Sequence, residues 1–200
     1  DQLDILKPFG NGNPEPVFGF FNMTLKKIRS IGKGKHLKLK FDQDGYALEV
    51  LYFNKSVYDF LYYEGEVLDV AVRLSKNEYK GTVSVSAQVV DLRLSNLDFR
   101  NILEHKVVYE KFKLNNYLSQ DEIDSLVPVH EDFASVYRYM KLINNKPVRA
   151  DLLSERIFKG NKNTAKIYTI IDVMEEKGLA DVFRNGDEYK ISIKNVSQKV

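Results

Sequence analysis

The residues best suited to chemistry in this sequence are basic, and they are concentrated in one segment. Between Phe21 and Lys40 there is no Asp or Glu, although the net charge of the whole chain is only +2. A cationic strip on a near-neutral protein indicates a polyanionic partner, most commonly a nucleic-acid backbone, but a solvated lysine-rich surface gives the same pattern. The seven basic residues of the strip are Lys26, Lys27, Arg29, Lys33, Lys35, Lys38 and Lys40.

Groups for metal or nucleophilic catalysis are scarce. The chain has no Cys, which excludes disulfides, thiolate zinc sites and a cysteine nucleophile. Its three histidines, His36, His105 and His130, are too far apart in sequence for a metal-ligand spacing. No apolar run approaches the roughly 18 residues of a membrane span, and no signal-peptide pattern is present. We therefore expect a soluble, cytoplasmic chain with no catalytic residue, no metal or cofactor site and no membrane contact.

Alternation of apolar and polar residues predicts five strands in residues 1–95. Val57, Phe60 and Leu61 have helical spacing and predict a short helix over 55–64, which Gly65 would end. A polar stretch, residues 75–81, predicts the turn between the last two strands. The predicted strands are 16–31, 35–42, 46–53, 67–74 and 82–94.

Three strands, a short helix and two more strands are typical of a small Greek-key barrel of the oligonucleotide-binding (OB) type. Such barrels bind single strands on the outer face of strands two and three and on two flanking loops. His36, Lys38 and Lys40 share one face of the second predicted strand. Tyr79 is the better stacking candidate, because the alternation does not show which of Tyr52 and Phe53 is outside. The predicted nucleic-acid contacts are Lys26, Lys27, Arg29, Lys33, Lys35, His36, Lys38, Lys40, Lys76, Tyr79 and Lys80.

The remaining residues differ in pattern and predict a second domain. Residues 96–131 read as a connector with one short helix, opened by a capping box at Ser119 and Glu122. Residues 132–200 read as three helices, the third capped by Asn161 or Asn163, and then a hairpin around Asn185-Gly186. This order is typical of a winged helix. The chain as a whole is therefore predicted to be α+β with two domains, a five-stranded OB-type barrel followed by a winged-helix-like domain.

The third helix of that second domain offers a second contact surface, for DNA or for a protein partner. Asp172, Glu175 and Glu176 follow on the same helix and would repel a phosphate backbone. A protein-docking role is therefore at least as well supported as DNA binding here. The candidate residues are Asn161, Lys162, Asn163, Lys166 and Arg184.

A segment rich in Gly, Asn and Pro precedes the first predicted strand. It lacks the Gly-Lys-Ser/Thr ending of a nucleotide-binding loop, so it reads as a shaped lead into the barrel. Residues 9–18, FGNGNPEPVF, together with Ile31-Gly32 and the HLKL run of residues 36–39, resemble the segment entering the barrel of RecJ-type exonucleases. The resemblance covers residues 3–95. Residues 131–137, EDFASVY, are similar to the extra C-terminal domain of family members from Gram-positive bacteria.

This resemblance implies a fragment of a bacterial enzyme that digests single-stranded DNA from the 5′ end in repair and recombination. The family uses two divalent metals, Mn²⁺ or Mg²⁺, bound through an Asp-His-His motif in an N-terminal core, and no Asp-His-His occurs here. The expected function is thus a non-catalytic, single-strand-binding accessory region. Its implied partners are single-stranded DNA, its own catalytic core and a single-strand-binding protein. The alternative is an interaction module that docks the core or that protein and has little DNA affinity. DNA and RNA are not distinguished, because nothing addresses the 2′-hydroxyl.

Overall fold

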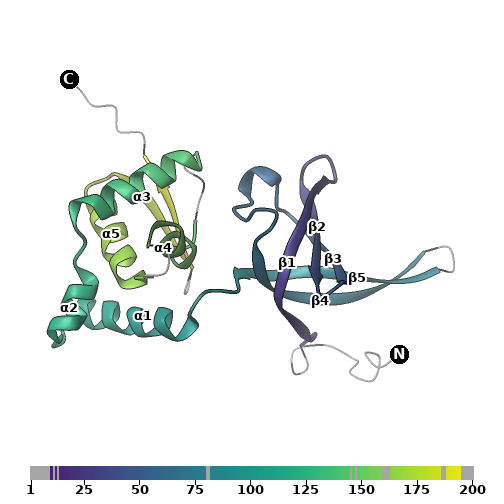
Figure 1. Ribbon diagram of the computed structural model, residues 1–200, viewed down its shortest axis with the longest axis horizontal. Coiled ribbons are helices and arrows are strands. Elements are labelled where there is room, and N and C mark those ends of the chain that lie inside the picture. Colours follow the sequence, from purple (N-terminus) through teal and green to yellow (C-terminus); the bar gives the residue numbers. More distant parts are fainter. Residues whose placement is uncertain are drawn as a thin grey trace. The chain divides into compact units, whose positions relative to one another are not determined.

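The computed structural model divides into two compact units, residues 1–96 and residues 97–200 (Figure 1). The structure describes residues 10, 12, 14–79, 82–144, 146, 148–158, 163–185 and 188–194. Within these ranges no helix is both long and apolar enough to cross a membrane.

Five strands form the first unit: β1 (Val17–Ile31), β2 (His36–Gln43), β3 (Tyr46–Tyr52), β4 (Val67–Tyr79) and β5 (Thr82–Leu94). They close into a barrel with the strand order β1-β2-β3-β5-β4. Neighbouring strands are antiparallel except β3 and β5, which pair in parallel. A closed sheet satisfies the backbone groups that edge strands would expose. The predicted five-stranded OB-type barrel is confirmed.

Alternation along the strands separates a buried interior from an exposed surface. In β2, Leu37, Leu39 and Phe41 are fully buried, whereas Lys40 between them is exposed. Burial of one such large apolar side chain contributes about 1.5–3 kcal/mol. This core fixes which side of β2 faces outward, and therefore where its lysines lie.

The connection between β3 and β4 is not the helix predicted over 55–64. Only η2 (Val57–Asp59) is helical, a single 3₁₀ turn in which the Ser56 side chain accepts a hydrogen bond from the Asp59 N–H. Phe60 follows in extended backbone, and both Phe60 and Leu61 are buried. The apolar residues of this segment are thus buried from a largely non-helical chain, so their helical spacing was misleading.

Strand β4 continues through most of the predicted polar turn, residues 75–81. The β4–β5 ladder runs from Leu68–Leu94 to Tyr79–Thr82. The hairpin therefore extends beyond the other three strands, as Figure 1 shows. Polar residues are tolerated in these strands because an extension of two strands has both faces in solvent. The polar pattern that predicted a turn belongs to a strand ladder instead.

Residues 96–131, expected to form a connector, contain two helices of the second unit. The first, α1 (Phe99–Lys113), was not predicted and packs against α5 (Thr164–Glu176). Tyr109 is its one buried residue, so its sequence carries little amphipathic signal. The short helix predicted after Ser119 is α2 (Gln120–Leu126), with the capping box formed between Ser119 and Glu122.

The rest of the second unit consists of α3 (His130–Leu142), α4 (Ala150–Phe158), α5 and the antiparallel pair β6 (Ala180–Asn185) and β7 (Glu188–Ile193). Asn163, one of the two predicted caps, accepts a hydrogen bond from the Lys166 N–H at 2.9 Å. A single bridge joins Val148 to Ile191 of β7. The core of this unit includes Val136, Met140, Leu153, Ile167, Ile170, Ile171 and Ile191.

Candidate nucleic-acid interface

Four basic side chains lie next to one another on the outer surface of β1 and β2. Lys27 is paired with Lys40, and Arg29 with Lys38, across the antiparallel ladder. Cross-strand partners point to the same side of a sheet, with Cβ atoms about 4.5–5.5 Å apart. The residues that alternate with them, such as Leu39, face the core. We call Lys27, Arg29, Lys38 and Lys40 the basic face.

A β-bulge and a tight turn add the other three residues of the cationic strip. The β1–β2 register shifts between Leu25 and Lys27, so Lys26 is the extra, exposed residue of the bulge. The turn between the strands exposes Lys33 and Lys35. All seven basic residues of the cationic strip are therefore gathered on the β1–β2 hairpin.

Glu49 on β3 lies among these cations. It is paired with Lys40 in the β2–β3 ladder, and its Oε2 is 2.7 Å from Nζ of Lys38. The hydrogen bond from Lys38 lowers the pKa of Glu49, and the charges of Lys38, Lys40 and Arg29 add to this effect. Because the pair is exposed, it adds little to stability. Its consequence is local: Glu49 orients Lys38 and cancels part of the positive charge of the basic face.

His36 begins β2 beside the basic face, and three neighbours hold its ring. Its Nδ1 accepts a hydrogen bond from the Asn54 N–H at 3.0 Å. The neutral ring therefore carries its proton on Nε2, which remains a donor. The exposed ring of Phe53 contacts it edge-on, with centroids 5.1 Å apart. On another side the backbone of Gly32 comes so close that a Cβ there would lie 2.7 Å from His36 Cδ2.

Replacing Gly32 by Ala should therefore displace His36. Gly32 has φ +58°, a conformation that costs an L-residue about 1–2 kcal/mol, and the added methyl group would also overlap the ring. We expect the barrel to lose about 1–2 kcal/mol of stability and the Asn54 amide to lose its hydrogen-exchange protection. Gly34→Ala is the matched control, since Gly34 has φ +87° in the same turn but only Ser30 Oγ nearby, at 3.9 Å. Equal loss of Asn54 protection in both variants would contradict the role given to Gly32.

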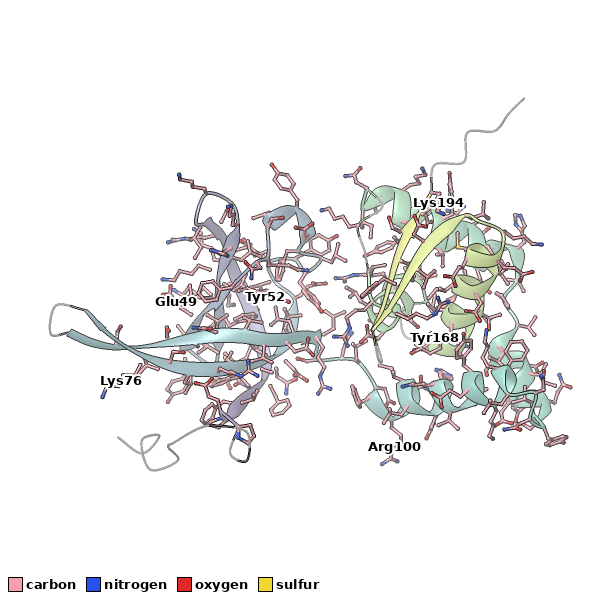
Figure 2. All side chains as sticks on the ribbon, turned by 180° about the vertical axis from the view of Figure 1, so that it is seen from behind. Glu49, Tyr52, Lys76, Arg100, Tyr168 and Lys194 are labelled. Atoms are coloured by element: carbon pink, nitrogen blue, oxygen red, sulfur yellow. The ribbon has the colours of Figure 1, made fainter. Side chains whose placement is uncertain are left out.

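Of the three predicted contacts on the β4–β5 hairpin, only Lys76 has a described side chain, and it is not part of the basic face. Lys76 lies opposite Val85 in the ladder. Alternation along β4 puts Lys76 on the same side of the strand as Val72, the side that faces the core within the barrel. The basic face lies on the opposite, outer side of the sheet. Figure 2 shows Lys76 on the extended part of the hairpin. The side chain of Tyr79 and the whole of Lys80 lie outside the described residues.

Comparison with known proteins assigns this barrel to a family. Residues 1–91 match the family model described as the RecJ OB domain. The barrel is a RecJ-type OB domain. A curated relative, the single-stranded-DNA-specific exonuclease RecJ of Thermus thermophilus, is 31% identical over 97 residues, which are 46% of this chain and 12% of that protein.

Two crystal structures of T. thermophilus RecJ are also similar to this chain. The structure of the complex with Mn²⁺ matches at 34% identity and a TM-score of 0.32, covering 44% of this chain and 12% of that one. The structure of the complex with Mg²⁺ matches at 20% identity and a TM-score of 0.35, covering 84% and 34%. The family assignment rests on the sequence match of residues 1–91, and the chain spans only 12% of the length of the curated relative.

The RecJ-type OB domain also places residues at this surface that the sequence reasoning missed or left open. Phe53, rather than Tyr52, is the exposed aromatic residue, 42% accessible beside His36. Tyr52 instead contacts the buried Phe60, with ring centroids 6.4 Å apart. Glu49 was not considered as a counter-charge. The two-residue turn Asp44-Gly45 could have predicted the positions of both Phe53 and Glu49. It pairs Gln43 with Tyr46, and this pair fixes which residues of β2 and β3 lie opposite one another.

The three described residues of the predicted second contact surface, Asn163, Lys166 and Arg184, have structural partners. Asn163 caps α5, and Lys166 Nζ lies 3.4 Å from Asp132. Arg184 on β6 forms ion pairs with Asp172 and Glu175 on α5. Asn161 and Lys162 lie outside the described residues. In the described part of the chain, this set therefore does not form an open cationic surface like the basic face.

Helix α5 is covered by α1 over much of its length. The rings of Tyr109 and Tyr168 are 5.0 Å apart, and His105 Nδ1 accepts a hydrogen bond from the Thr164 N–H at 3.3 Å. Burial lowers the pKa of His105, which keeps the ring neutral and able to accept this bond. A helix that reads DNA must present an open face to a groove. The described side chains of α5 that are buried are Thr164, Ala165, Ile167, Tyr168, Ile170, Ile171 and Met174.

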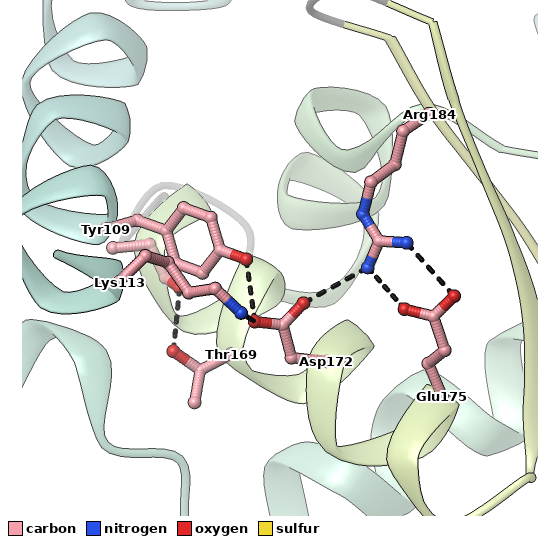
Figure 3. A network of polar contacts seen from close by, with 7 residues as sticks. Tyr109, Lys113, Thr169, Asp172, Glu175 and Arg184 are labelled. Carbon is pink, nitrogen blue, oxygen red and sulfur yellow. Dashed lines mark hydrogen bonds and ion pairs between the residues drawn. The ribbon is translucent and has the colours of Figure 1, made fainter.

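Asp172 is the centre of the polar contacts that join α1, α5 and β6 (Figure 3). It accepts hydrogen bonds from the Tyr109 hydroxyl at 2.7 Å, from Lys113 Nζ at 2.9 Å and from Arg184 at 3.2 Å. Burial by itself would raise the pKa of Asp172, but the bonds from Tyr109 and Lys113 and the nearby cations outweigh it, so the pKa is lowered. The bond from Arg184 to Glu175 raises the pKa of Arg184. This network is structural rather than an exposed binding surface.

The metal-binding core implied by the family has no counterpart in the described ranges. In them no group of three or more His, Asp or Glu side chains is placed to hold a metal ion. The described side chains therefore do not fit the two-metal chemistry of a phosphodiesterase, which needs clustered oxygen and imidazole ligands.

Proposed function

We propose that this chain is a single-strand-binding accessory region of a RecJ-type exonuclease. The observation that carries the proposal is the basic face: Lys27, Arg29, Lys38 and Lys40 lie together on the outer surface of β1 and β2. In OB barrels this surface is where single strands bind. The accessory role is supported by the exonuclease activity in the name of the T. thermophilus relative. A catalytic core carried elsewhere would need its substrate strand positioned.

The proposed chemistry is neutralisation of phosphates without reading of sequence. Each lysine or arginine that meets a phosphate releases counterions, and the affinity for a single strand falls with salt by a slope of about −0.7 per contact. Four contacts from the basic face give a slope of about −2.8, or about a fiftyfold loss between about 50 mM and about 200 mM salt. Contacts of this kind hold and orient a strand while allowing it to slide toward a catalytic core.

Fluorescence anisotropy with a labelled single-stranded oligonucleotide tests this function. We expect binding at low salt that weakens with a slope of about −3 in a plot of log affinity against log salt. Absence of binding at low salt would contradict the proposal and favour the interaction-module alternative. A purified chain that degrades the oligonucleotide in the presence of Mn²⁺ would contradict its assignment as non-catalytic.

Neutralising Glu49 should strengthen binding. Glu49→Gln removes the carboxylate that pairs with Lys38, so one more cation becomes available and the surface potential rises. We expect about two- to fivefold tighter binding of a single strand, the scale of one exposed ion pair. Glu176→Gln in the second unit is the control with the same change in net charge, because Glu176 is exposed and distant in sequence from the barrel. Equal gains in both variants would mean that net charge, not the basic face, sets the affinity.

For the second unit we propose a winged-helix-like fold that serves as a protein-interaction module. The order α3, α4, α5, β6 and β7, with Val148 bridged to Ile191, supports the fold. The covered face of α5 and the ion pairs of Arg184 with Asp172 and Glu175 favour a protein partner over DNA. The family resemblance suggests two partners, the enzyme's own catalytic core and a single-strand-binding protein.

The anisotropy titration also distinguishes the contributions of the two units to DNA binding. If the basic face alone binds DNA, Arg184→Ala should leave the affinity for a single strand unchanged. A loss of affinity in Arg184→Ala as large as in a variant of the basic face would contradict the assignment of DNA binding to the barrel.

A further inference from the structure

An ordered aromatic pair lies at one end of the basic face. His36 is the first residue of β2, and Phe53 follows the last residue of β3. Their rings meet edge-to-face, with centroids 5.1 Å apart and planes at 72°. Phe53 is 42% exposed although it is a large apolar side chain. An edge-to-face contact engages the edge of one ring, so the pair can still offer an aromatic surface to a ligand.

The pair is held before any ligand arrives. The Asn54 N–H fixes the His36 ring through Nδ1 at 3.0 Å, and Asn54 is the residue directly after Phe53. The turn glycine Gly32 packs against the other side of the same ring. Rotamer freedom that is lost in the free protein need not be lost on binding, which favours affinity. The two rings are therefore organised in the way expected of a binding platform.

The pair is also placed next to cations in the register of the sheet. His36 is paired with Ile31 on β1, and the next outward pair along the same two strands is Lys38 with Arg29. Successive outward residues on a strand are about 6.6 Å apart, close to the distance between successive phosphates of an extended strand. A strand whose phosphates follow Arg29, Lys38 and Lys40 would therefore bring a base within reach of the rings.

We propose that Phe53, held by His36, is a stacking platform for one base of the bound strand. The inference rests on the proposed function and extends it, because it makes the ligand a base-bearing strand rather than any polyanion. Every base has a π-face, so a platform of this kind adds affinity without sequence preference. Nε2–H of His36 adds a donor for an acceptor atom of the same nucleotide.

The experiment compares two strands of equal length and charge, one of thymidines and one of abasic residues. Both present the same phosphates, and only the first presents bases. We expect the wild-type chain to bind the thymidine strand about five- to tenfold more tightly. Phe53→Leu should lose this preference and bind the abasic strand as the wild type does. Phe53→Trp should restore the preference, because the larger ring also stacks.

Phe21→Leu is the matched control. Phe21 is another exposed phenylalanine of the barrel, 58% accessible, on the part of β1 that pairs with β4 rather than β2. It should keep the preference for the thymidine strand. Equal losses on both strands in Phe53→Leu, or a preference that Phe53→Leu retains, would overturn the platform but would not contradict the proposed single-strand binding. If the wild type binds neither strand, the proposed function fails and the platform fails with it.

Discussion

Reversing the charge of Lys38 and Lys40 together is expected to weaken single-strand binding by about 30- to 100-fold at low salt. The two side chains are successive outward residues of β2 and belong to the basic face. The double variant Lys38→Glu/Lys40→Glu removes two phosphate contacts and adds two repulsive charges. The salt slope should fall from about −2.8 to about −1.4, because half of the four contacts are lost. Anisotropy titrations at several salt concentrations measure both quantities.

A control with the same change in charge separates site from net charge. Arg100→Glu/Lys177→Glu alters two exposed residues of the second unit. The control should change affinity by less than about threefold, because it makes the same change in net charge but removes no residue of the basic face. Thermal unfolding should show both variants to be folded. Equal losses in the two double variants would contradict a localised binding face.

Replacing Asp172 by Ala is expected to destabilise the second unit by about 2–3 kcal/mol. The Tyr109 hydroxyl would lose its acceptor, and Lys113 would lose its carboxylate. Hydrogen exchange read by mass spectrometry measures the effect locally, with faster exchange expected in α1 and α5 and no change in the barrel. Tyr109→Phe is the milder comparison and should cost about 1 kcal/mol, since it removes one hydrogen bond.

The contribution of Asp172 should also depend on pH. Its pKa is lower in the folded chain than the roughly 3.9 of an unfolded aspartate. A carboxyl group of this kind contributes stability that is complete above the unfolded pKa and is lost as the pH falls through the folded pKa. The stability difference between the wild type and Asp172→Ala should therefore be constant near neutral pH and shrink below about pH 4. A difference that grows in acid would contradict the network assigned to Asp172.

Much of the barrel follows from local patterns in the sequence. The strict alternation of Leu37, Leu39 and Phe41 with the lysines of β2 predicts both the buried face and the exposed one, as the structure has them. The five strands and the closed OB-type topology follow from similar patterns and from their order. The β2–β3 register was also accessible, because a two-residue turn at Asp44-Gly45 sets every later pair. It would have placed Glu49 opposite Lys40.

Other features depend on contacts that a single sequence does not display. Asp172 and Tyr109 are 63 residues apart, so nothing local indicated that α1 would cover α5. Lys76 was expected in a loop because its neighbours are polar, whereas these residues belong to the β4–β5 ladder. Arg184 was a candidate contact for DNA or for a protein partner, because it is a cation on the predicted hairpin. Its partners on α5, Asp172 and Glu175, become neighbours only after folding.

We propose that an unpaired strand binds on the outer face of the β1–β2 hairpin. Mapping backbone amide shifts in ¹H–¹⁵N spectra during titration with a thymidine strand tests it most directly. The predicted changes lie in β1 from Lys26 onward, in the turn at Gly32–Lys35, in β2 and at Phe53–Asn54, with the amides of α5 and β6 unmoved. Changes concentrated in α5 and β6, or no changes at a saturating strand concentration in low salt, would contradict the claim.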